Sequence, residues 1–120
     1  MKIAIASKRG DFNSEVDETF GRCSYFLIIE IKDKKIGKIE TIKNENQNQM
    51  GGAGIQTAKL VAEQGAEAVI AKNMGPRASA VLNQFNISIY LGDGLVKDVL
   101  QLFINDKLEK YDNSDSNRAS

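Results

Sequence analysis

The chain alternates between short runs of apolar, mostly β-branched residues and segments rich in polar residues and glycine. Five of these runs have the length and composition of buried β-strands and are bounded by turn-forming residues. They predict strands at residues 2–6, 25–31, 36–42, 66–71 and 87–91. Because only a short polar stretch separates the second run from the third, we expect these two strands to form an antiparallel hairpin.

Apolar residues with helical spacing follow the third, fourth and fifth strands. The first helical segment carries Ala58 and Val61 on one face, and Gly65 is placed to end it. The second begins at Pro76, whose missing N–H is no loss in a first turn, and the third covers residues 95–104. The order predicts an α/β domain, in which a mixed five-stranded sheet has strand two alone antiparallel and helices on its faces.

The chain has the length of one ordinary domain, with 120 residues and no internal repeat or linker. We predict a single domain over residues 1–108. The remaining residues, 109–120, are almost all polar and predict a disordered tail.

In this arrangement the glycine-containing segments 21–23, 51–54, 72–75 and 92–94 all fall at one edge of the sheet. The edge lies at the carboxyl ends of the parallel strands, where open α/β sheets bind ligands. The sequence therefore predicts a binding site at this edge.

Composition and charge narrow the chemistry. The 16 basic and 16 acidic side chains balance, so the chain lacks the basic excess of nucleic-acid-binding domains. No apolar run reaches the roughly 18 residues of a membrane span, and no secretory signal is visible, so we expect a cytoplasmic protein with no membrane or nucleic-acid partner. The chain has no histidine, which excludes a Ser-His-Asp triad, a Cys-His pair and a histidine zinc site within one chain.

The single cysteine, Cys23, cannot form an intramolecular disulfide. It follows Arg22, and a thiolate beside an arginine is a good ligand for iron and iron–sulfur clusters. The alternative is that Cys23 packs as a small apolar side chain at the start of the second strand. Arg22 can bind an anionic ligand or pair with a neighbouring carboxylate such as Asp17.

Two glycine-containing turns lead into helices. Gly52 and Gly54 precede the first helix, where free N–H groups favour an anion and glycine lets it approach the backbone. Gly75 and Arg77 flank the proline that begins the second helix. The alternative for both turns is an ordinary helix start that binds no ligand, and neither turn is a P-loop or a dinucleotide motif.

The predicted strand order invites comparison with ribonuclease H, whose activity needs clustered carboxylates that hold divalent metals. The first predicted strand has no carboxylate, and Asp11, Asp17 and Asp93 are scattered among predicted loops. We therefore expect no nuclease activity and assign no catalytic residues.

Four segments, in this order, resemble the dinitrogenase iron-molybdenum cofactor biosynthesis family. They are Phe20-Gly21-Arg22-Cys23 with Tyr25-Phe26, then Gly52 and Gly54 with Ile55 and Ala58, then Met74-Gly75-Pro76 with Ala78, and then Ile87, Ile89 and Tyr90 with Gly92. The resemblance covers roughly residues 1–108. The family includes nitrogenase accessory carrier proteins and small stand-alone members.

The resemblance implies a ribonuclease H-like three-layer fold and a non-enzymatic carrier. Its ligand would be an iron–sulfur cluster or an iron-molybdenum cofactor precursor, exchanged with a metallocluster donor or acceptor protein. Together with the motifs, it gives the expected cofactor-binding residues as Arg22, Cys23, Gly52, Gly54, Gly75 and Arg77, with Cys23 as the metal ligand.

In the nitrogenase accessory members, a histidine just before the Phe-Gly-Arg segment contributes to cluster binding. This chain has Thr19 at that position. A single thiolate is too few for a closed cluster site, so a cluster would need exogenous thiols, a second subunit or a partner protein. The alternative function is a small-anion or nucleotide-binding regulatory domain without a metal. The sequence leaves open the physiological cofactor, the partner and the oligomeric state.

Overall fold

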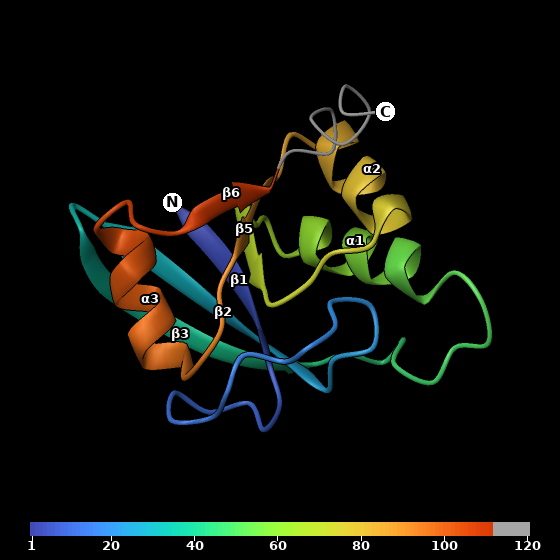
Figure 1. Cartoon of the computed structure of the whole chain (residues 1–120), viewed down its shortest axis with the longest axis horizontal. Coiled ribbons are helices and arrows are strands. Elements are labelled where there is room, and N and C mark those ends of the chain that lie inside the picture. The colour runs from blue at the N-terminus through green and yellow to red at the C-terminus, as the bar shows by residue number, and fades with distance from the viewer. Residues whose placement is uncertain (112–120) are drawn as a thin grey trace.

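A six-stranded mixed sheet with the order β3-β2-β1-β4-β5-β6 runs through the middle of the molecule (Figure 1). The computed structural model describes residues 1–111. The strands are β1 Lys2–Ser7, β2 Tyr25–Lys32, β3 Lys35–Lys43, β4 Ala68–Ala71, β5 Ser88–Leu91 and β6 Glu109–Tyr111, and the helices are α1 Ala53–Glu63, α2 Pro76–Gln84 and α3 Val96–Ile104. β1 is parallel to β4, and β4 to β5, whereas β2 and β6 run antiparallel to their neighbours.

The sequence predicted the first five strands and the three helices to within a few residues, but the prediction of five strands with only strand two reversed is wrong. The sixth strand, β6, pairs antiparallel with β5. Its residues were assigned to a disordered tail because they contain no apolar run. The ladder with β5 and the packing of Tyr111 against the core order them instead, and neither is visible in composition. The rest of the predicted tail lies outside the described residues.

Two local predictions are confirmed. β2 and β3 form an antiparallel hairpin whose two-residue turn has Asp33 and Lys34 at φ of 53° and 64°, the positive values that a type I′ turn requires. Gly65 ends α1 with φ of 81°, the left-handed conformation that favours glycine after a helix.

Alternating side chains divide the core between the two faces of the sheet. On one face, Ala4 and Ala6 of β1 belong to a fully buried cluster with α1 and α2. On the other face, Ile3 and Ile5 belong to a second cluster with α3. Figure 1 shows the resulting three layers, with α3 on one side of the sheet and α1 and α2 on the other.

Within residues 1–111, no helix is both long enough and apolar enough to cross a membrane. The longest, α1, has 11 residues, against the roughly 20 that a helical span requires.

Gly92 supplies a test of the packing between the sheet and α3. A Cβ atom on Gly92 would lie 2.5 Å from Cγ1 of Val99 and 3.3 Å from Cγ2 of Ile70. We predict that Gly92→Ala lowers the free energy of unfolding by about 1–3 kcal/mol, the usual cost of overpacking. Since Val99→Ala opens the required space, the double variant should lose less than the sum of the two single losses, as measured by urea unfolding. Additive losses would contradict this packing.

Candidate functional site

Three segments that are distant in the sequence meet at one end of the molecule through glycine. The loop before β2 places Gly21 against the start of α1, where a Cβ atom on Gly21 would lie 2.8 Å from Cα and 2.9 Å from N of Gly54. Gly54 lies in turn against α2, where its own Cβ atom would be 3.3 Å from Cβ of Ala78. A side chain at position 21 would collide with backbone, so this close approach requires glycine.

Two buried polar side chains hold the loop in this position. Nδ2 of Asn44 donates to the carbonyl oxygens of Gly21, at 3.1 Å, and Cys23, at 2.9 Å. The hydroxyl of Thr57 on α1 lies 2.9 Å from the same Gly21 oxygen and 3.3 Å from Oδ1 of Asn44. Asn44 and Thr57 are fully buried, where polar groups are stable only when hydrogen-bonded. The loop therefore has a fixed geometry on α1.

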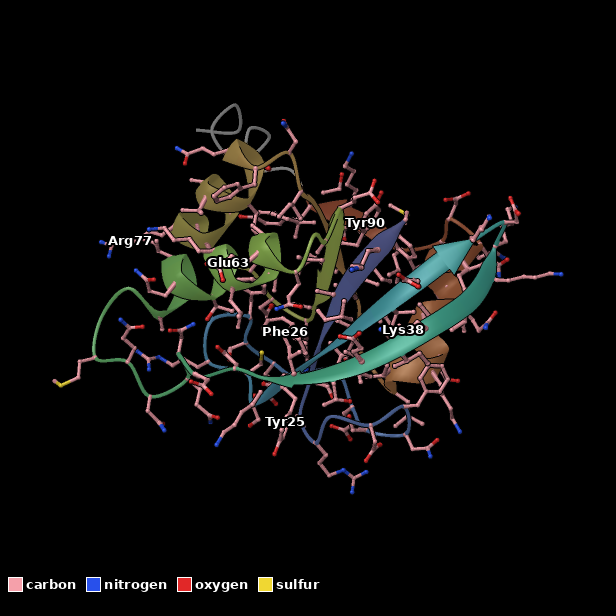
Figure 2. The ribbon with its side chains drawn as sticks, turned by 180° about the vertical axis from the view of Figure 1, so that it is seen from behind. Tyr25, Phe26, Lys38, Glu63, Arg77 and Tyr90 are labelled. Atoms are coloured by element: carbon pink, nitrogen blue, oxygen red, sulfur yellow. The ribbon has the colours of Figure 1, made fainter. Side chains whose placement is uncertain are left out.

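A cleft, here called the glycine cleft, lies at this contact. It consists of two adjoining hollows of about 380 and 360 Å³ that share Thr19, Gly21, Gly54 and Arg77. Its lining comprises residues 19–22, 52–55, 73 and 75–78, which include two arginines and no carboxylate. In Figure 2, Arg77 extends from the start of α2 at the end of the molecule where the loop into α1 also lies.

The starts of α1 and α2 both line this cleft, and neither has a side-chain cap or an acidic residue in its first turn. The N–H groups of a first helical turn have no partner within the helix. At α3 such groups are satisfied by the chain itself, because Val96 N–H donates to Ser14 O at 2.9 Å and Lys97 N–H to Phe12 O at 3.2 Å. The cleft therefore brings together the positive ends of two helix dipoles, neither of which has an acidic first-turn residue or a side-chain cap among the described residues.

The two cleft arginines add positive charge. The ion pairs within residues 1–111 are Lys8–Glu15, Lys38–Glu40 and Lys72–Asp93, so neither arginine pairs with a carboxylate there. Arg22 donates from Nη1 to the carbonyl oxygen of Gln47 at 2.9 Å. A guanidinium group carries five N–H donors, so both arginines have donors left for a ligand.

Cys23 does not line the cleft. Its side chain is fully buried in the cluster that contains Phe20 and Phe26, and Sγ lies 3.9 Å from Nδ2 of Asn44. Burial, reinforced by the negative charge of Asp17, raises the pKa of the Cys23 thiol far above its ordinary value. The thiol is therefore protonated at neutral pH, and the geometry favours the alternative in which Cys23 is a packing residue.

The structure thus brings together five of the six residues predicted to bind the cofactor, namely Arg22, Gly52, Gly54, Gly75 and Arg77. Sequence reasoning missed the structural role of Gly21, although it stands in the quoted Phe-Gly-Arg segment, and it missed the polar pair Asn44 and Thr57. A single asparagine at the start of a polar loop carries no signal that distinguishes it from its exposed neighbours. Thr19, noted only as a departure from the family, lines both hollows.

The donor groups of the cleft decide which ligands it fits. Within the described chain, no three side chains of the histidine, cysteine, aspartate or glutamate type lie close enough to hold a metal ion together. The cleft instead offers backbone N–H groups and guanidinium groups, which recognise anions. It therefore fits a ligand that brings its own negative charge and, if it contains metal, its own metal ligands.

A larger hollow of about 580 Å³ lies between the end of α2 and β6 and is lined by Asn86, Ser88, Lys110 and Tyr111 among others. It adjoins the last described residue, and its lining contains none of the six residues predicted to bind the cofactor. The glycine cleft is therefore the candidate site.

Known proteins are similar to this chain in sequence and in fold. The family model described as dinitrogenase iron-molybdenum cofactor matches residues 1–106. An uncharacterised protein of Methanocaldococcus jannaschii is 36% identical over 113 residues, which make up 93% of this chain and 92% of that protein. The apo form of the orange protein from Desulfovibrio gigas superposes with a TM-score of 0.82 at 25% identity, over 92% of each chain. A Thermotoga protein provisionally described as a NifB protein superposes with a TM-score of 0.77 at 27% identity, over 91% of each chain.

The contact between Gly21 and Gly54 can be tested by adding one methyl group. We predict that Gly21→Ala lowers the free energy of unfolding by about 1–3 kcal/mol, because the new Cβ collides with the backbone of α1. Gly51→Ala is the matched control, since a Cβ there meets nothing within 4 Å. Thermal and urea unfolding of both variants measure the difference, and equal stabilities would rule out the close approach.

The burial of Cys23 predicts an unreactive thiol. At pH 8 the native protein should react with an aromatic disulfide reagent on the order of 100-fold or more slowly than the protein in denaturant, because reaction requires local opening. Rapid stoichiometric reaction of the native protein would contradict the assigned burial.

The raised pKa adds a pH dependence to the same prediction. The unfolded thiol ionises near pH 8.5 whereas the folded thiol stays protonated, so the unfolded state is favoured as the pH rises above that value. Stability should therefore fall more steeply above about pH 8.5 in the wild type than in Cys23→Ala. Parallel curves for the two proteins would speak against the shift.

Proposed function

The chain belongs to the dinitrogenase iron-molybdenum cofactor family, and we propose that its glycine cleft carries an anionic metal–sulfur cargo for a partner protein. The cargo is an iron–sulfur cluster or an iron-molybdenum-type cofactor precursor. The partner is the metallocluster protein that donates or accepts it. The chain acts as a binding protein and not as an enzyme.

One observation carries this proposal. Within residues 1–111, two helix starts without side-chain caps and two arginines without carboxylate partners line the same cleft, while the start of α3 is closed by the chain's own carbonyl groups. Preorganised N–H groups and guanidinium groups bind anions without first having to break strong internal contacts. Metal–sulfur clusters with thiolate or sulfide ligands are anions of this kind.

The burial of Cys23 supports a particular way of holding the cargo. The only thiol of the chain is fully buried in the core cluster that contains Phe20 and Phe26, so the proposal uses no coordinate bond from Cys23. The cargo keeps its own sulfide and exogenous thiolate ligands and is bound by charge and hydrogen bonds. Transfer to a partner then requires no exchange of a protein ligand on the carrier.

Thr19 supports a general role in metallocluster handling. The two hollows of the cleft share this residue, at the position where the resemblance places a histidine in nitrogenase accessory proteins. A hydroxyl can donate a hydrogen bond to an anion but is a poor ligand for iron. Of the two cargoes, we therefore propose a common iron–sulfur cluster in preference to a nitrogenase-specific cofactor.

A ribonuclease H-like assignment of the fold and a cytoplasmic location are part of the same proposal. The strand order β3-β2-β1-β4-β5 supports the former.

The second candidate is a metal-free regulatory domain that binds a small anion or a nucleotide. It draws on the same open helix starts, which also suit phosphate groups. A difference in affinity between a thiolate-capped cluster and ATP distinguishes the two candidates.

We predict that a preformed, thiolate-capped iron–sulfur cluster co-elutes with the wild-type protein under anaerobic gel filtration, detected by visible absorption and iron content. Arg22→Gln/Arg77→Gln should weaken binding about 100-fold or more, since each charge-assisted hydrogen bond contributes roughly 1.5–3 kcal/mol. High salt should also weaken it. Between about pH 6 and about pH 9 the affinity should stay constant, because arginine remains charged.

Two control variants show whether a loss of binding is specific to the cleft arginines. Lys32→Gln/Lys35→Gln removes the same charge at the far end of the β2–β3 hairpin and should bind as the wild type does. Cys23→Ser should also retain the cluster. Loss of the cluster in Cys23→Ser with full retention in the arginine variant would overturn the proposed mode of binding.

A further inference from the structure

We propose that Arg22 is a positioning residue that couples the glycine cleft to loop 45–51, so that a bound anion orders this loop at the rim of the cleft. The inference rests on the proposed function, because it takes the cleft to be an anion site. It goes beyond that function by identifying the segment whose structure differs between the loaded and the free protein.

Arg22 lies between the cleft and loop 45–51 and contacts both. Its side chain lines the cleft, and its Nη1 donates to the carbonyl oxygen of Gln47 in the loop at 2.9 Å. A guanidinium group is planar and rigid, with five donors that point in different directions in one plane. It can therefore hold the loop with one N–H and an anion with others, and fixing it on the anion also fixes the position of its partner carbonyl.

The backbone on either side of this contact is held by hydrogen bonds to Asn44. Asn44 binds the carbonyl oxygens of Gly21 and Cys23, which flank Arg22, and its own N–H donates to Ser24 O at 2.9 Å. Oδ1 of Asn44 also accepts the N–H of Asn46 at 3.1 Å. The backbone around Arg22 and the first residues of the loop are therefore hydrogen-bonded to the same buried side chain, Asn44. A change in the position of Arg22 is then passed directly to the loop.

The second half of the loop is much less restrained. Met50 is 99% exposed. A Cβ atom on Gly51 or Gly52 would meet nothing within 4 Å, and Gly52 has φ of 72°. This glycine pair leads directly into α1, whose open start is the other anion-binding element of the cleft. Loop 45–51 is thus bounded by two groups that would contact the same anion, Arg22 near its beginning and the first turn of α1 at its end.

Arg77 provides a matched comparison, because it lines both hollows of the cleft but makes no hydrogen bond to the loop within the described chain. Both arginines attract the anion through their positive charge, whereas only Arg22 also makes a hydrogen bond to the loop. Lysine at either position keeps the charge and loses the planar set of donors. The two Arg→Lys variants therefore separate coupling from affinity.

The experiment is amide hydrogen exchange of residues 45–51, measured under anaerobic conditions with and without a saturating thiolate-capped iron–sulfur cluster, and in parallel with inorganic sulfate and inorganic phosphate. In the wild type we expect the cluster to slow exchange in this loop on the order of tenfold. Arg77→Lys should give the same slowing once saturated. Arg22→Lys should show no slowing at saturation, with occupancy confirmed by visible absorption.

The outcomes separate the two levels of the account. If the cluster binds the wild type but leaves exchange in the loop unchanged, or if Arg22→Lys slows as the wild type does, the coupling is wrong and the proposed function stands. If sulfate or phosphate slows the loop and the cluster does not bind, the coupling holds for a different anion and the metal–sulfur cargo is wrong. If none of these anions binds, both proposals are overturned.

Discussion

The close contact between Gly21 and Gly54 is the constraint on which the rest of the site depends. It brings the loop before β2 onto the backbone of α1 and lets α1 lie close to Ala78 of α2. A larger residue at position 21 would separate these segments, because the nearest atoms belong to backbone that cannot rotate away. The buried side chains Asn44 and Thr57 donate hydrogen bonds to the loop carbonyl oxygens at this contact, so these carbonyl groups keep partners although they are removed from water.

The same physical element, the start of a helix, serves two purposes in this molecule. At α3 the first N–H groups donate to carbonyl oxygens of the loop after β1, which fixes that loop on the start of α3. At α1 and α2 no such partner is found within residues 1–111, and residues of both first turns line the glycine cleft beside Arg22 and Arg77. Because one helix start is closed and two are open beside the arginines, the donor groups that suit an anion are concentrated at the glycine cleft. The chain has no histidine, so no imidazole changes the charge of this site near neutral pH.

Much of the fold could be predicted from the sequence, because the strands and helices are marked by apolar periodicity and by turn residues such as Pro76 and Gly65. The exception is β6, whose three residues are ordered by pairing with β5. Topology correctly predicted that the glycine-containing segments 21–23, 51–54 and 72–75 meet at one edge, whereas the fourth predicted segment, 92–94, lines neither hollow of the cleft. Cys23 shows the limit of this reasoning, because its neighbour Arg22 faces the cleft while the thiol points into the core, and residue type alone does not reveal that direction.

The central claim is that an anionic cargo lies in the glycine cleft, held by groups of the first turns of α1 and α2. The most direct measurement is an amide NMR titration of the full chain with a paramagnetic, thiolate-capped iron–sulfur cluster, which broadens the signals of nearby residues. The account predicts that broadening is centred on Thr19, Gly54 and Arg77 and is suppressed by high salt. Broadening centred on the hollow between α2 and β6, or spread evenly over the surface, would contradict it.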